Sequence, residues 1–192
     1  YTGNHVTVEK EDYATRLRIF GYTQEDFKTL ILPMSVVGKE AIGSMGTDTP
    51  LAVLSDRSQL LYNYFKQLFA QVTNPPLDGI REEIVTDTSL SIGNSNNLFD
   101  ITEEHAKKLS IQNPVISNED LDKIKYIEHP DYKTISVSTL YALEKGVNGL
   151  ENALENIISE IEKALDTGAN IVILSDRGVS SEMAPIPILL AC

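Results

Sequence analysis

The tetrapeptide Leu-Ser-Asp-Arg occurs twice, at 54–57 and at 174–177, each time after a run of apolar residues. Residues that follow a buried parallel strand lie where α/β proteins bind ligands. Carboxylates at Asp56 and Asp176, or guanidinium groups at Arg57 and Arg177, are therefore candidates for contacting a substrate. The alternative is structural, because Ser and Asp cap helices and turns. We favour this second interpretation, with Ser55, Asp56, Arg57, Ser175, Asp176 and Arg177 as strand-end caps.

A second polar stretch, Gly-Ser-Met-Gly-Thr-Asp at 43–48, has the small residues of a loop that cradles an anion with backbone N–H groups. It matches neither the P-loop nor the dinucleotide fingerprint. His5, His105 and His129 lack the i, i+4 spacing of a zinc site. Composition and spacing therefore favour a plain mobile loop or an interdomain contact over an anion site, and they point to no catalytic, cofactor-binding or metal-binding residue.

The composition excludes some partners. The 192 residues carry 16 Lys and Arg against 28 Asp and Glu, a net charge of −12, which argues against nucleic acid. The single cysteine, Cys192, excludes an internal disulfide and a multi-cysteine metal site. Apolar runs all fall short of the roughly 20 residues of a membrane span. We expect a cytoplasmic protein without a membrane partner, and the apolar ending at 186–192 suggests a segment of a longer chain.

Hydrophobic patterns supply the elements that would position these residues. Strands are expected at 51–54, 133–142 and 170–176, and helices at 23–34, 58–72, 80–85, 102–109, 118–127, 148–168 and 185–192. Thr23, Thr102, Asn118 and Asn148 are the expected helix caps, Gly168 suits the end of the long helix, and Pro33 should kink or end the first helix. The order of these elements predicts an α/β fold with a mostly parallel sheet and helical crossovers.

Two stretches also resemble a known family. The segment FKTLILPMSVVGKEAIGSMGTDTPLAVLSDRSQLLYNYFKQLFAQVTNPPLDGIREE, at 27–83, is similar to the central domain of the large (α) chain of glutamate synthase. GANIVILSDRGV, at 168–179, is similar to the end of the same domain. Two residues depart mildly from the family pattern: Thr47, where an acid is usual, and Gly79, where proline is common.

This resemblance implies a rudimentary or incomplete TIM-barrel-like domain without a flavin. We expect an N-terminal linker and helix at 1–50 and an α/β central domain at 51–192, truncated at its C-terminal end. The parent would hydrolyse glutamine in an amidotransferase domain and pass ammonia to an FMN- and iron–sulfur-containing domain that makes glutamate from 2-oxoglutarate. A small subunit or ferredoxin would interact with the parent, and the fragment alone would be inactive.

The central domain would then connect the two catalytic domains. Candidate interdomain or tunnel-side contacts are Gly43, Ser44, Met45, Gly46, Asp48, Thr73, Asn74, Pro75, Pro76 and Asp78. Both segments are distinctive in sequence, and the Asn-Pro-Pro turn is rigid. The rival interpretation is a stand-alone α/β enzyme or binding protein, with Asp56, Arg57, Asp176 and Arg177 around one pocket at the strand ends.

Overall fold

The computed structural model describes residues 10–41, 50–67, 69–70, 72 and 75–192. Contacts divide the chain into two compact units, one within 7–77 and one within 78–192. This boundary lies after Leu77, whereas the sequence patterns place a division at residue 50. Each unit is described separately below, because its internal contacts define it.

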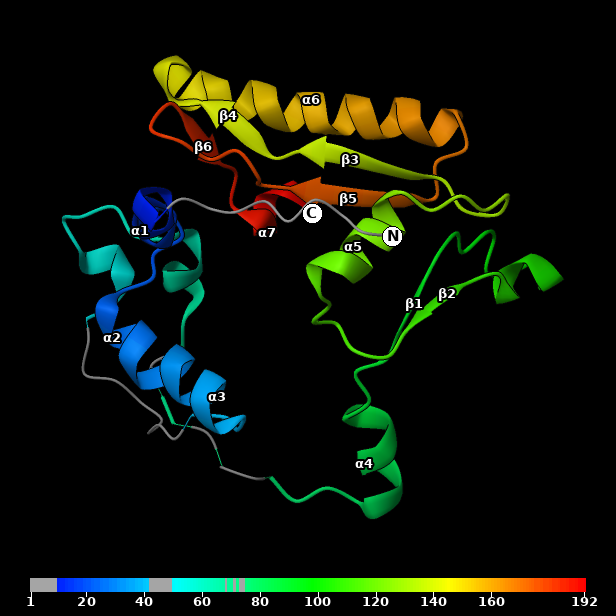
Figure 1. Ribbon diagram of the computed structural model, residues 1–192, viewed down its shortest axis with the longest axis horizontal. Coiled ribbons are helices and arrows are strands. Elements are labelled where there is room, and N and C mark those ends of the chain that lie inside the picture. The colour runs from blue at the N-terminus through cyan, green and yellow to red at the C-terminus, as the bar shows by residue number, and fades with distance from the viewer. Residues whose placement is uncertain (1–9, 42–49, 68, 71, 73–74) are drawn as a thin grey trace. The chain divides into compact units, whose positions relative to one another are not determined.

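The unit within 78–192 is built around one parallel strand pair. Strand β3 (Thr134–Ser138) pairs in register with β5 (Ile171–Ser175). Helix α6 (Gly146–Asp166), which precedes β5, and helix α5 (Asn118–Lys125), which precedes β3, both contact β3 and lie on opposite faces of the pair (Figure 1). The chain therefore folds here as an α/β unit, as the apolar patterns predict, with a helix on each face of the strand pair.

The core lies between the strand pair and α6. Val137, Ile157 and Ile186 are its buried centre, with exposed fractions of 0%, 4% and 3%. Apolar residues at three- and four-residue spacing give α6 one face for this contact. The helix begins at Gly146 rather than at the predicted cap Asn148, and ends before Gly168, whose φ of 86° is the left-handed conformation expected there.

The predicted strand at 133–142 is interrupted at Thr139. Its two halves, β3 and β4 (Leu140–Ala142), pair with different partners, since β4 joins β6 (Met183–Pro185) in an antiparallel pair. Thr139 is 1% exposed, and its N–H donates to the Ser175 carbonyl at 2.9 Å. Its carbonyl accepts from the Ile186 N–H at 2.7 Å. The backbone of Thr139 is thus hydrogen-bonded at the junction between the β3–β5 pair and the β4–β6 pair.

The third strand pair is antiparallel too, between β1 (Leu90–Ile92) and β2 (Leu109–Ile111). Helices α4 (Gly79–Val85) and α7 (Ile188–Ala191) complete the helices of this unit, with 3₁₀ turns at Glu103–Ala106 and Leu143–Lys145. The expectation of a mostly parallel sheet is wrong, because among the described strands only β3 and β5 pair in parallel. These strands form no closed barrel, so the barrel likeness is not confirmed.

In the unit within 7–77, the regular secondary structure of the described residues is all helical. Helix α1 (Lys10–Ile19) is followed by a continuous helical segment made of α2 (Gln24–Asp26), the π-helix η1 (Phe27–Ile31) and α3 (Leu32–Val37). Pro33 does not end this segment. A proline cannot close its own helical hydrogen bond, and the wider π turn lies directly before it, with the Leu32 N–H donating to the Phe27 carbonyl.

At two predicted elements of this unit, the described residues form 3₁₀ turns instead. Residues 51–54, expected as a buried strand, form the 3₁₀ turn η2 (Ala52–Leu54), and Val53 and Leu54 are 71% and 72% exposed. Within the expected helix at 58–72, the structure has the 3₁₀ turn η3 (Leu61–Phe65), and Phe65 is 69% exposed. Both predictions require the apolar side chains to be buried, whereas Val53, Leu54 and Phe65 are exposed.

The predicted cap Thr23 forms a capping box with Asp26 at the start of α2. The Thr23 hydroxyl accepts from the Asp26 N–H at 3.1 Å, and the Asp26 carboxylate accepts from the Thr23 N–H at 2.9 Å and from the Thr23 hydroxyl at 2.7 Å. The hydrogen bond from the Thr23 hydroxyl, and then that from its N–H, lower the pKa of Asp26.

Thr23→Ala should therefore destabilise the first turn of α2 by about 1 kcal/mol, since the Asp26 N–H loses its acceptor. It should also move the pKa of Asp26 back toward 3.8. The pKa of Asp26 is lower in the folded chain than in the unfolded one. The stabilisation that the ionised Asp26 carboxylate gives is therefore complete above pH 3.8 and is lost as pH falls through the folded pKa. Carbon-detected NMR titration of Asp26 in both proteins checks the shift, and an unchanged titration would contradict the prediction.

Candidate functional site

The predicted interdomain contacts are only partly visible. Gly43, Ser44, Met45, Gly46, Asp48, Thr73 and Asn74 lie outside the described residues. Pro75, Pro76 and Asp78 are exposed. Asp78 is the N-cap of α4, where its carboxylate accepts from the Ile80 N–H at 3.3 Å. The contact role of both segments stays a prediction.

The first Leu-Ser-Asp-Arg copy does not follow a strand, which corrects the assignment of Ser55, Asp56 and Arg57 as strand-end caps. It follows the 3₁₀ turn η2, and all three residues are exposed. The Ser55 hydroxyl accepts from the Arg57 N–H at 3.1 Å and from the Gln59 side-chain amide at 3.2 Å. The serine thus closes a local turn.

The second copy does follow a strand, β5. The Ser175 hydroxyl accepts from the Arg177 N–H at 3.4 Å, the same i to i+2 bond as in the first copy. The Arg177 guanidinium donates to the side-chain oxygen of Asn118, at the start of α5, at 3.2 Å. The feature that the two copies share is a serine-closed turn. The premise that each copy follows a strand fails at the first copy.

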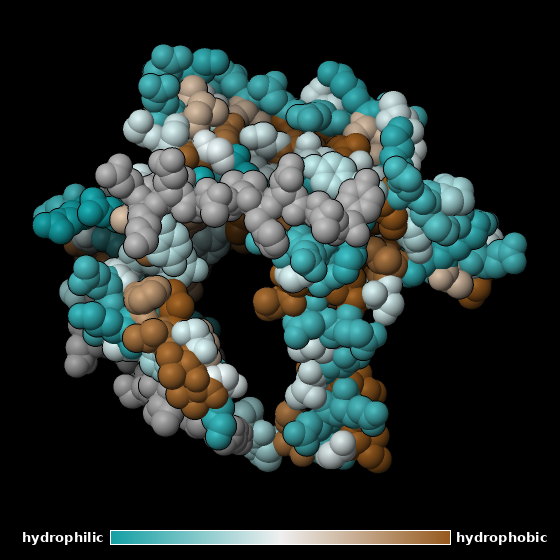
Figure 2. Space-filling model, viewed as in Figure 1, coloured by the Kyte–Doolittle hydropathy of each residue, from teal (hydrophilic) through white to brown (hydrophobic). Residues whose placement is uncertain are grey.

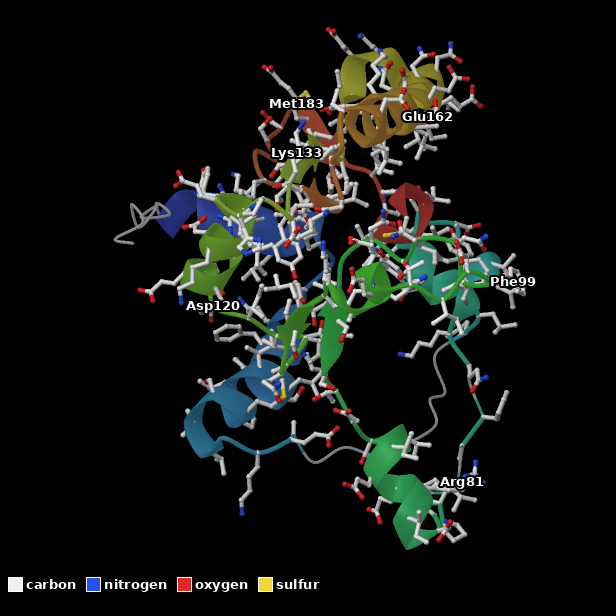
Figure 3. The ribbon with its side chains drawn as sticks, turned by 90° about the vertical axis from the view of Figure 1, so that its right-hand side faces the viewer. Arg81, Phe99, Asp120, Lys133, Glu162 and Met183 are labelled. Atoms are coloured by element: carbon white, nitrogen blue, oxygen red, sulfur yellow. The ribbon has the colours of Figure 1, made fainter. Side chains whose placement is uncertain are left out.

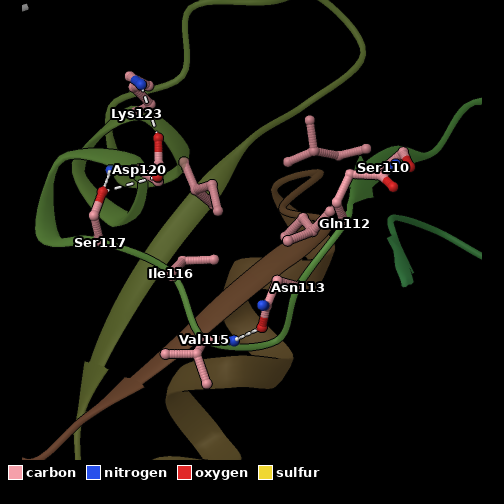
Figure 4. A pocket seen from close by; sticks show the side chains of 11 residues that line it. Ser110, Gln112, Asn113, Val115, Ile116, Ser117, Asp120 and Lys123 are labelled. Carbon is pink, nitrogen blue, oxygen red and sulfur yellow. Dashed lines mark hydrogen bonds and ion pairs between the residues drawn. The ribbon is translucent and has the colours of Figure 1, made fainter. Parts of the chain in front are cut away.

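The pockets of this unit lie instead around α5, where the sequence predicts a helix but no functional site. One open pocket of about 410 Å³ lies between β2, the 112–117 segment and α5 (Figure 4). Its wall is mostly apolar, with Leu109, Ile111, Val115, Ile116 and Ile124 among the lining residues. The sequence signal that could have found this pocket is the short apolar group Val115-Ile116.

Charged and hydroxyl groups lie on one side of this pocket. The Ser117 hydroxyl, not the predicted Asn118, caps α5 by accepting from the Asp120 N–H at 3.1 Å. Lys123 donates to the Asp120 carboxylate at 2.8 Å, and the Ser117 hydroxyl donates to it at 2.8 Å. The hydrogen bond from Lys123, followed by that from Ser117, lowers the pKa of Asp120. At neutral pH the Asp120 carboxylate and the Lys123 ammonium group are therefore both charged, and they bind each other.

A second open pocket, of about 450 Å³, lies between the β1–β2 pair, α5 and the start of β5. Its lining is again mostly apolar, including Ile92, Leu121, Ile124, Ile171 and Ile173. Neither pocket has Asp176 or Arg177 among its lining residues. Their surfaces suit an apolar side chain or segment, and the acid and base among the lining residues, Asp120 and Lys123, are paired with each other.

The histidines of the described residues are engaged locally. His105 Nε2 lies 3.0 Å from the Asp100 carbonyl, and His129 Nδ1 lies 3.2 Å from the Asp131 N–H. Within the described part of the chain, no group of three or more His, Cys, Asp or Glu side chains is placed to hold a metal ion. Among the same residues, no helix has the length and apolar character needed to cross a bilayer.

Comparison with known proteins adds the missing context. Residues 15–192 match the family model described as the glutamate synthase central domain. The chain is 44% identical over 180 residues to the glutamate synthase [NADPH] large chain of Bacillus subtilis, covering 94% of this chain and 12% of that protein. It is 42% identical over 175 residues to the glutamate synthase [NADH] of Schizosaccharomyces pombe, covering 90% of this chain and 8% of that protein.

A third relative differs in the reductant that its name states. The chain is 42% identical over 176 residues to the ferredoxin-dependent glutamate synthase 2 of a Synechocystis strain, covering 90% of this chain and 11% of that protein. The chain thus spans about a tenth of the length of these relatives.

Proposed function

This chain belongs to the glutamate synthase central-domain family, and we propose that it is the connecting domain of its parent enzyme. In this role it holds the glutamine amidotransferase domain against the FMN-binding synthase domain. Ammonia released from glutamine then reaches 2-oxoglutarate without escaping to water, and the reductive synthesis of glutamate follows. The segment itself contributes no catalytic group, and the parent's FMN and iron–sulfur cluster are held elsewhere in the parent.

The observation that carries this proposal is the exposed apolar surface of the unit within 7–77. Every residue of this unit whose exposure is described is at least partly exposed. Large apolar side chains project from the helical segment, with Met34, Val36 and Val37 exposed by 43%, 74% and 63% (Figure 2). Water-exposed patches of this kind mark interfaces. A unit of this size gains little stability without such burial, which supports packing against other domains.

The distribution of charge between the two units also supports an interface on the unit within 7–77. Residues 7–77 carry seven Lys and Arg against eight Asp and Glu, a net charge of −1. Residues 78–192 carry nine against twenty, a net charge of −11. Nearly all of the net negative charge therefore belongs to the second unit, whereas the first is apolar and close to neutral. Burial in an interface costs less for such a surface, because few charges must be desolvated.

The connecting role predicts a specific kinetic defect. Pro75 and Pro76 stiffen the chain just before α4, and replacing both with glycine in the full-length parent should loosen this joint. We expect glutaminase activity to stay near its normal rate while glutamine-dependent glutamate formation falls severalfold, with free ammonia appearing in solution. Both rates are measured on the same enzyme preparation.

Asn74→Ala and Met45→Ala extend this test to the predicted contacts outside the described residues. A matched control is Pro130→Gly, in the turn before β3 and more than fifty residues further along the chain. If glutamine hydrolysis and glutamate formation remain coupled as in the unaltered enzyme in all three test variants, the connecting role is wrong.

A further inference from the structure

The loop between β1 and β2 carries three large apolar side chains in almost complete contact with water. Leu98, Phe99 and Ile101 are 75%, 99% and 92% exposed. An isolated exposed leucine is ordinary, but three such side chains within four positions form a patch. Phe99, labelled in Figure 3, alone would bury well over 100 Å² in a partner.

The apolar side chains lie on an ordered turn. The Asp100 N–H donates to the Asn97 carbonyl at 3.0 Å, which places Leu98 and Phe99 at the two central positions of the turn. The Asn97 side-chain oxygen also accepts from the Phe99 N–H at 3.1 Å. This bond is the local one by which asparagine stabilises turns. The geometry of the 97–101 turn is therefore set before any partner binds.

The loop around the turn is held from both sides. The Lys108 ammonium group donates to the Gly93 carbonyl at 3.0 Å and to the Ser95 hydroxyl at 2.7 Å, and it also contacts the Asn94 carbonyl. On the other side, His105 Nε2 lies 3.0 Å from the Asp100 carbonyl. Rigidity of this kind lowers the entropy lost on binding, so it favours docking at such a turn.

The charges near the turn are mostly negative. Asp100 lies on the turn, and Glu103 and Glu104 begin the 3₁₀ turn that follows it. Lys107 is already paired, at 2.9 Å with Glu104 and at 3.5 Å with Asp131, and hydrogen bonding to Glu104 raises the pKa of this lysine. Asp100 and Glu103 therefore give the apolar turn an acidic border. The complementary surface is an apolar pocket bordered by Lys or Arg.

We propose that the 97–101 turn inserts into such a pocket in the parent chain outside residues 1–192. The proposal rests on the proposed function, because it takes the partner from the same parent enzyme. About nine tenths of the relatives' length lies outside the matched region. A surface in the same polypeptide is present at a high effective concentration, so it is favoured over a separate molecule.

A photocrosslink in the full-length parent locates the partner. The photoreactive residue p-benzoylphenylalanine is placed at position 99, and at position 147 as a control, since Val147 is 74% exposed on α6. We expect position 99 to link to a peptide outside 1–192 that contains Lys or Arg, and position 147 to give no such link. A link within 1–192, a link to a second copy or no link at all would each overturn the proposal.

A second measurement separates docking from folding. Phe99→Ser should increase hydrogen exchange in the linked peptide about fivefold, whereas Phe99→Leu and Val147→Ser should leave it unchanged. Exchange in α6 should be the same in all of these proteins. Equal exchange in the linked peptide for Phe99→Ser and Phe99→Leu would overturn the proposal. The ratio of glutaminase to glutamate-forming activity tests the connecting role independently, so failure of one is distinguishable from failure of the other.

Discussion

Truncation of Ile157 to alanine should cost about 2–5 kcal/mol of the free energy of unfolding. Ile157 is 4% exposed and packs in the cluster with Val137 and Ile186, between α6 and the β3–β5 pair. The loss combines the transfer free energy of the removed methyl and methylene groups with the cavity left behind. Urea unfolding of the variant, followed by circular dichroism, measures the effect.

The next residue supplies the control. Ile158 is 59% exposed, one position along the same helix, and has the same side chain. Ile158→Ala should change the free energy of unfolding by at most about 0.5 kcal/mol, because alanine is the better helix former and little area is lost. Equal losses at 157 and 158 would mean that α6 does not pack on the strand pair by the face described.

This contrast between neighbours also shows what the sequence could predict. The α6 pattern repeats over five turns, so its type, its buried face and its end at Gly168 follow from spacing alone. The apolar run of β5 likewise identifies a strand. The chain supplies both layers of this contact within 78–192, so local pattern and final packing agree there.

The unit within 7–77 behaves differently for a physical reason. Leu51 to Leu54 and Leu61 to Phe65 have apolar patterns that predict a strand and a helix, but a strand needs a neighbour and an apolar helix face needs a cover. Within this unit the side chains of Val53, Leu54 and Phe65 remain exposed. Sequence patterns report that a segment is suited to burial, and they cannot supply the surface that buries it.

The candidate site was less predictable still. The Leu-Ser-Asp-Arg repeat predicts two strand ends. What the two copies share is instead a hydrogen bond from the arginine N–H to the hydroxyl of the serine two residues before it. The pockets around α5 depend on contacts between segments distant in sequence, which no short motif encodes. The capping residues Thr23 and Ser117 act within one helical turn, and only the first was predicted, because Asn118 was the equally good alternative for the second.

Asn170→Ala should destabilise the unit within 78–192 by about 1–2 kcal/mol. The Asn170 side chain joins the turn after α6 to the start of β3. Its oxygen accepts from the Lys133 N–H at 2.9 Å, and its amide group donates to the Asp131 carbonyl at 2.6 Å. Alanine leaves both backbone groups without this partner, and because the site is partly open, water recovers some of the loss. Urea unfolding gives the total effect.

The two bonds of Asn170 can be separated by a second variant. Asn170→Asp keeps the acceptor for the Lys133 N–H but turns a carboxylate oxygen toward the Asp131 carbonyl in place of the donor, so it should be less stable at neutral pH than the unaltered protein and regain stability as the new carboxyl is protonated. Lys133 also donates from its ammonium group to the Thr167 carbonyl at 2.7 Å, at the end of α6, which is left intact in both variants. Faster hydrogen exchange should therefore be confined to the 131–134 and 169–171 amides. If exchange were uniformly faster through α6, the start of β3 and the end of the helix would be opening as one unit. That outcome would show that Asn170 supports the helix itself.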